Sequence, residues 1–205
     1  MASHTSKSGR AVDWLTDRIF RLVLAILLMM SFDRRRDWSG WVVAHIVSPI
    51  AGFPTRIRTN LKLVFPDMPE AEVRRMVRAV PDNIGRSMIE TYSGDDFIKC
   101  VASSAVTGPG LAALDKAHSD GRPVLLVTGH IGNHDAIRAA LILRGYRVGV
   151  LYRPMSNSFF NQHYVTALSK TGTPLFARNR KGLIDMVRFL RGGGMVGVVL
   201  DQHMK

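Results

Sequence analysis

Short apolar runs alternate with helix-period segments along the second half of the chain. Four runs have the length of buried strands: residues 124–128, 148–152, 174–177 and 195–200. Three segments with helical spacing lie between them and are each followed by glycine: residues 133–144, 159–170 and 182–191. This βαβαβαβ pattern predicts an α/β fold with a mostly parallel sheet flanked by helices.

The preceding part of the chain has helical spacing and no strand pattern. A helix is expected to stop at Pro66 and another to start near Pro69. The second one has one apolar face, made by Val73, Met76, Val77 and Val80. Pro81 is expected to end or kink it, and a further helical stretch continues to about residue 92.

The N-terminal region contains an uninterrupted apolar run at residues 22–30, flanked by arginines. No small-residue cleavage site follows, so the run is not expected to be removed as a signal peptide. Residues 14–32 reach the length of a membrane span only by including charged residues, so a marginal span, an interfacial or re-entrant anchor and a buried helix all remain open. We expect three segments: a membrane anchor with a basic flank at 1–37, a basic helical region at 38–105, and an α/β core at 106–205.

The charge of the 205-residue chain points to an anionic partner. Lys and Arg number 28 and Asp and Glu 16, so the formal net charge is +12. Nucleic acid, an anionic membrane surface, and an acidic carrier or phosphorylated substrate all fit such a surface. The single Cys100 excludes an internal disulfide and any zinc site made of several cysteines.

Polar residues follow three of the predicted strands at the point where each one ends. His130 follows the run at 124–128, Arg153 follows 148–152, and Asp201 and Gln202 follow 195–200. Parallel α/β sheets bind ligands outside the carboxyl ends of their strands. We therefore expect these side chains to converge on one edge of the sheet.

The stretch "GHIGNHDAI" has the spacing of a histidine base and its carboxylate. Asp135 can fold back across a turn to accept the proton on one nitrogen of His130, which leaves the other nitrogen to take a proton near neutral pH. Gly129 and Gly132 allow a tight turn and the approach of substrate, and Asn133 is expected to cap the following helix.

Four blocks in order carry a resemblance to a known family: "RTNLKLVFPDMPEAEVRRM", "GHIGNHDAIRAA", "LYRPMSN" and "VVLDQ". From about residue 56 to residue 202, the chain resembles the HxxxxD/E acyltransferase superfamily. Within it, the chain is most similar to the late lipid A acyltransferases, the lauroyl/myristoyl transferases of Gram-negative bacteria. The resemblance implies a glycerolipid acyltransferase-like core, preceded by a membrane-anchor helix and a helical region.

The implied reaction moves a fatty acyl chain from acyl carrier protein, or less often from coenzyme A, to a hydroxyl of a phosphorylated lipid A precursor. His130 would deprotonate that hydroxyl, which attacks the thioester directly, and Asp135 would orient His130. No cofactor and no metal are implied. Nothing demands a second subunit, so a monomer is expected.

The resemblance also implies a substrate-binding set at the strand ends. Arg153 would hold a substrate phosphate, and Asn157 would support its loop. Asp201 and Gln202 match the family's Asp-Gln pair and would organise the site. The acceptor is a membrane lipid, so the implied location is the bacterial inner membrane with the catalytic domain on the cytoplasmic side.

Two features depart from the family pattern. His134 and Asp135 stand where relatives more often carry an aromatic residue and glutamate. The family also continues with further strands and helices after the Asp-Gln block, whereas this sequence stops at Lys205. The expectation is therefore an α/β core that lacks its C-terminal part.

Several other interpretations remain open. His130, His134 and Asp135 could form a metal site, although no third or fourth ligand is evident elsewhere. A lysophosphatidate-type glycerolipid acyltransferase would share the His/Asp pair, but we find none of its Phe-Pro-Glu-Gly block. A non-catalytic membrane fragment is a third reading. A nucleic-acid-binding module is not expected, because aromatic residues do not interleave with the basic ones.

Overall fold

The computed structural model describes residues 7–201, which form two compact units. One unit contains the described residues up to Ile19 together with those from Gly94 onward, and the other contains residues 20–93. The helix α1 (Lys7–Leu28) contributes to both. The segment boundaries expected after residues 37 and 105 were drawn from changes in charge and hydrophobic pattern along the sequence. They stay predictions.

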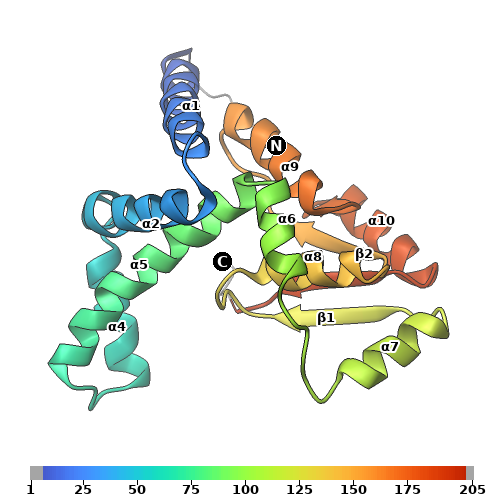
Figure 1. Ribbon diagram of the computed structural model, residues 1–205. Helices are drawn as coiled ribbons and strands as arrows, with labels where there is room; N and C mark the ends of the chain where they lie inside the picture. Colours follow the sequence, from blue (N-terminus) through green and yellow to red (C-terminus); the bar gives the residue numbers. More distant parts are fainter. Residues whose placement is uncertain (1–6, 202–205) are drawn as a thin grey trace. The chain divides into compact units, whose positions relative to one another are not determined.

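The first unit is built on a parallel four-stranded sheet (Figure 1). Its strands are β1 (Val124–Thr128), β2 (Val148–Tyr152), β3 (Leu175–Ala177) and β4 (Met195–Val199), in the order β1-β4-β2-β3. The helices that connect the strands are α8 (His134–Leu143), α9 (Ser158–Thr171) and α10 (Arg180–Arg191). Two further helices, α6 (Asp95–Ala102) and α7 (Leu111–Ser119), precede β1. The predicted α/β fold with a parallel sheet is confirmed, and each predicted strand and connecting helix lies within two residues of its expected ends.

The sheet has an apolar core on each face. On one face, Leu141 of α8 packs with Tyr146, Val148 and Met195, and Leu114 of α7 lies against this cluster. On the other face, residues of β3 and β4 pack with α10, and the members of this cluster are Phe176, Val196, Val198, Met186, Phe189 and Leu190. Successive residues of a strand point to opposite faces, so the continuous apolar runs found in the sequence supply both cores.

The second unit is helical. It contains α2 (Phe32–Val42), the π-helix η1 (Val43–Val47), α3 (Ser48–Ile50), α4 (Phe53–Val64) and α5 (Glu70–Tyr92). The helix α5 packs along α2, where Ser39 Oγ donates a hydrogen bond to the carbonyl oxygen of Gly85 at 2.8 Å. A Cβ on Gly85 would lie 2.4 Å from the carbonyl oxygen of Ser39, so glycine permits this approach.

Pro81 does not end the helix, which was one of the two outcomes that the sequence led us to expect. α5 continues through it to Tyr92, and Pro81 is buried. The proline removes one backbone hydrogen bond, and the part of α5 that follows it packs against α2, where Ser39 bonds to Gly85.

None of the helices in residues 7–201 combines the length and the apolar character needed to cross a membrane. The predicted membrane anchor is therefore not confirmed.

Candidate active site

His130 and Asp201 are joined by two hydrogen bonds at the carboxyl end of the sheet. The backbone N–H of His130 donates to Asp201 Oδ2, and His130 Nδ1 lies at 2.6 Å from Asp201 Oδ1. The N–H donation also measures 2.6 Å. These bonds from His130 lower the pKa of Asp201, so the carboxylate is charged at neutral pH. Nδ1 then carries the proton, and Nε2 is left as a proton acceptor.

The sheet topology brings these two residues together. β1 and β4 are neighbours, with Thr128 level with Val199, so the segments that leave their carboxyl ends start side by side. The backbone N–H of Leu200 donates to the carbonyl oxygen of Thr128 at 3.1 Å and extends the pairing toward Asp201. Gly129 also sits close to this pair, since a Cβ there would lie 3.1 Å from Asp201 Oδ2. Gly132 has φ +57°, the left-handed conformation that a tight turn into α8 requires.

The structure corrects the pairing of Asp135 with His130 that the spacing predicted. Both carboxylate oxygens of Asp135 accept hydrogen bonds from Arg138, Oδ1 from Nε at 2.5 Å and Oδ2 from Nη2 at 3.1 Å. Both side chains are buried. The helix begins at His134, so positions 135 and 138 lie on one face of its first turn and that face points inward. Asp201, which follows β4, occupies the place beside His130.

Arg138 continues this network across to α9. Its Nη1 donates to the carbonyl oxygen of Gly172 at 2.9 Å, and its Nη2 donates to that of Leu168 at 3.0 Å. The buried guanidinium thus joins the start of α8 to the end of α9. Sequence reasoning missed Arg138, although a carboxylate and an arginine three residues apart on a predicted helix would have pointed to it.

Asn133 and His134 start the helix beside His130. Asn133 is the predicted cap, because its Oδ1 accepts a hydrogen bond from the backbone N–H of Asp135 at 3.0 Å. The ring of His134 stands edge-on to that of His130, with 5.4 Å between the centroids. Burial lowers the pKa of His134, and the positive charge that His130 can carry lowers it further, whereas Asp135 opposes the shift. The second imidazole is therefore held neutral.

An apolar cavity lies between α8 and the sheet and is lined by His134. Its volume is about 330 Å³. The wall includes Val150, Gly197 and Val199 from neighbouring strands and Ile137 from α8. Such a volume and lining suit a small or extended apolar group. The ring of His134 therefore lies between this apolar cavity and His130.

One comparison with known proteins decides the family. A family model described as bacterial lipid A biosynthesis acyltransferase matches residues 2–205. The chain belongs to this family. A search of curated proteins found no match. The His130–Asp201 pair and the cavity are therefore parts of an acyltransferase that acts in lipid A biosynthesis.

Two further predicted site residues of this acyltransferase, Arg153 and Asn157, lie between β2 and α9. Arg153 follows β2, is exposed, and makes no side-chain hydrogen bond or ion pair within residues 7–201. Asn157 caps α9 by accepting from the backbone N–H groups of Phe159 and Phe160 at 3.0 and 3.1 Å. Its Nδ2 donates to the carbonyl oxygen of Asp13 at 2.9 Å. Gln202 lies outside the described residues. The substrate-binding roles of these residues stay predictions.

A buried contact between Asp17 and His163 holds α1 against α9 in the first unit. Asp17 has 0% exposure and lies 3.0 Å from His163, measured from Oδ1 to Nε2. Together with the hydrogen bond from Asn157 to Asp13, this contact attaches the start of α9 to α1. The end of the loop that contains Arg153 is attached in the same way. No motif surrounds His163, so sequence reasoning did not assign it a role.

No metal site is evident in the part of the acyltransferase that the structure describes. Within residues 7–201, no three His, Cys, Asp or Glu side chains cluster so that they could hold a metal ion. The possible set of His130, His134 and Asp135 is broken up because Asp135 binds Arg138.

Proposed function

We propose that the chain transfers a fatty acyl group, of the lauroyl or myristoyl class, from acyl carrier protein to a hydroxyl of a phosphorylated lipid A precursor. Membership of the lipid A acyltransferase family supports the acceptor pathway and the reaction type. The observation that carries the mechanism is the pairing of His130 Nδ1 with Asp201, which leaves Nε2 to accept a proton. The donor, the acyl length and the acceptor hydroxyl belong to the proposal.

In this mechanism His130 acts as the general base. Nε2 takes the proton of the acceptor hydroxyl as its oxygen attacks the thioester carbonyl. The C–S bond then breaks, and the protonated His130 returns the proton to the leaving thiolate. Asp201 stabilises the imidazolium that forms between these steps and keeps the Nδ1 proton in place. No covalent acyl-enzyme is required.

The cavity between α8 and the sheet is the proposed site of the acyl chain. Each buried methylene contributes about 0.8 kcal/mol, so even part of a fatty chain would bind firmly there. Gly197 lies in the cavity wall, where the absence of a side chain leaves room above β4. Arg153, at the neighbouring strand end, is the proposed contact for an acceptor phosphate, because a guanidinium binds phosphate through paired hydrogen bonds.

We further propose that the protein works as a monomer on the cytoplasmic side of the inner membrane, held there by α1. The apolar residues at every third or fourth position of α1 are exposed, and they include Val12, Leu15 and Ile19 at 63%, 53% and 56%. Asp17 lies on the opposite, buried face. An exposed apolar stripe on a basic protein supports attachment within the plane of an anionic membrane interface.

Acyl transfer by the detergent-solubilised wild type and by His130→Ala tests the proposal. The donor would be acyl carrier protein thioester, the acceptor a phosphorylated lipid A precursor, and the readout the product mass. We expect one added acyl chain with the wild type and a loss of about 10²–10⁴-fold with the variant. Near-normal transfer by His130→Ala would exclude the general-base role. Transfer to lysophosphatidate in place of the lipid A precursor would assign the acceptor to glycerolipids.

A further inference from the structure

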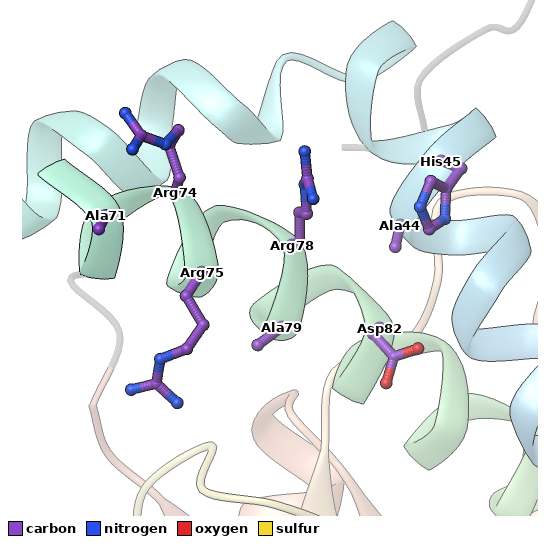
Figure 2. A pocket seen from close by; sticks show the side chains of 8 residues that line it. All are labelled: Ala44, His45, Ala71, Arg74, Arg75, Arg78, Ala79 and Asp82. Carbon is purple, nitrogen blue, oxygen red and sulfur yellow. The ribbon is translucent and has the colours of Figure 1, made fainter.

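The helical unit contains a basic groove that is separate from the residues around His130. It lies between η1 and α5 and has a volume of about 550 Å³. Three alanines line it, Ala44 of η1 and Ala71 and Ala79 of α5 (Figure 2). Arg74, Arg75 and Arg78 of α5 and His45 of η1 line it as well. The groove thus combines small apolar side chains with cationic ones.

The arginines of the groove repel one another, and this repulsion destabilises α5. A bound anion would remove it. Arg74 and Arg78 are four residues apart and extend from the same side of α5, whereas Arg75 extends from the other side (Figure 2). Like charges at this spacing destabilise a helix. Arg78 forms no side-chain hydrogen bond or ion pair with any residue in the described range 7–201.

The carboxylates near the groove do not cancel this charge. Arg74 pairs with Glu70 at 3.6 Å, and both side chains are more than half exposed, so the pair is weak and easily exchanged. Asp82 lines one end of the groove, but Arg86 Nε donates to it at 2.6 Å. The guanidinium of Arg78 and one side of Arg74 therefore remain available to a ligand.

The wall of the groove opposite α5 is formed by a turn with a rare backbone conformation. Residues 43–47 form a π-helix, and such turns are frequent at functional sites. His45 belongs to this turn, and its Nδ1 donates to the carbonyl oxygen of Trp41 at 2.9 Å while its ring stacks on the Trp41 indole. His45 is exposed, but these two contacts restrict its ring at the groove.

We propose that this groove binds a phosphate monoester group, with Arg78 and Arg74 as the principal contacts and His45 as the facing contact. A dianionic phosphate matches two guanidinium groups on one side of a helix. The alanine side chains of the lining offer small apolar contacts to the carbon atoms next to the phosphate. The group could belong to a lipid head or to a soluble phosphorylated molecule, and the recognising chemistry is the same.

Arg78→Gln and Arg34→Gln in the 205-residue chain form a matched pair for the test. Arg34 is an exposed arginine of the same helical unit that does not line the groove, and both changes remove one positive charge. Binding would be measured to phosphatidylcholine vesicles that contain either phosphatidate or phosphatidylglycerol at matched surface charge. Inorganic phosphate would be titrated separately, with tryptophan fluorescence as the readout, because Trp41 contacts His45.

We expect the wild type to bind phosphatidate vesicles more tightly than phosphatidylglycerol vesicles, and Arg78→Gln to lose about tenfold of that affinity or more. Arg34→Gln should keep the preference. Displacement by inorganic phosphate would show that a soluble phosphate shares the site, and resistance to displacement would assign the site to the lipid. Equal losses in the two variants, or equal binding to both vesicles, would overturn the proposal. Thermal melting of both variants confirms that they are folded.

Discussion

Replacing Asp201 by asparagine should abolish most activity while leaving the fold intact. Asparagine has one carbonyl oxygen and one amide group in place of two acceptor oxygens. Asp201 accepts from both the backbone N–H and Nδ1 of His130, so the amide cannot serve both bonds as an acceptor. It would also favour the histidine tautomer with the proton on Nε2, which cannot take a proton from the acceptor hydroxyl.

The expected loss in kcat is about 10²–10⁴-fold, the range for removing a correctly poised general base. Thermal stability should change little, because the His130 and Asp201 side chains are 46% and 43% exposed. The assay is acyl transfer at saturating donor, together with a melting curve of each variant. His130→Ala should show the same loss, and the double variant should lose no more than either single one.

Asp135→Asn is the contrasting variant. It leaves the buried guanidinium of Arg138 without its counter-charge, which costs about 3–5 kcal/mol of folding free energy. For a chain of this size the Tm should fall by about 6–20 °C. Below that temperature, kcat should stay much closer to the wild-type value than in Asp201→Asn.

A double variant, Asp135→Leu with Arg138→Met, separates stability from catalysis. It removes both charges of the buried pair, so part of the lost stability should return. If Asp135 instead orients His130, activity would stay lost in this stabilised protein. Low kcat in folded Asp135→Asn, combined with near-normal kcat in Asp201→Asn, would refute the pairing of His130 with Asp201 in the working enzyme.

Three further outcomes follow from the same site. Gly197→Val should favour shorter acyl donors without unfolding the protein, since the nearest atom to a new Cβ is the Gly149 carbonyl oxygen at 3.9 Å. Each methylene that no longer fits costs about fourfold in kcat/KM, and a donor series of increasing length measures this. The pKa of His134 is lowered, so the folded protein binds fewer protons there than the unfolded chain, and stability should fall as the pH drops below about 6.5. Melting curves of wild type and His134→Gln against pH would show this, with the variant lacking that part of the slope. Arg153→Ala should raise KM about tenfold or more for a phosphorylated acceptor and leave a dephosphorylated one unchanged; an equal effect on both would remove the phosphate-binding role.

Local sequence determined the elements of the α/β unit. The runs at 124–128 and 148–152 became β1 and β2 with the expected bounds, because short apolar runs between helical segments are typical of the strands of a parallel sheet. Asn133 capped α8 as predicted, since a cap depends only on atoms two or three residues apart. The family followed from short blocks that are themselves local.

Only the tertiary structure decided which carboxylate meets His130. Asp135 is five residues away in sequence, but the first turn of α8 directs its side chain inward to Arg138. Asp201 is 71 residues away, and it arrives because β4 inserts between β1 and β2. Strand order and the buried face of a helix arise from packing over the whole unit, so no spacing along the chain contains them. The same holds for the helical unit, where the packing of η1 against α5 sets three arginines beside a π-helical turn.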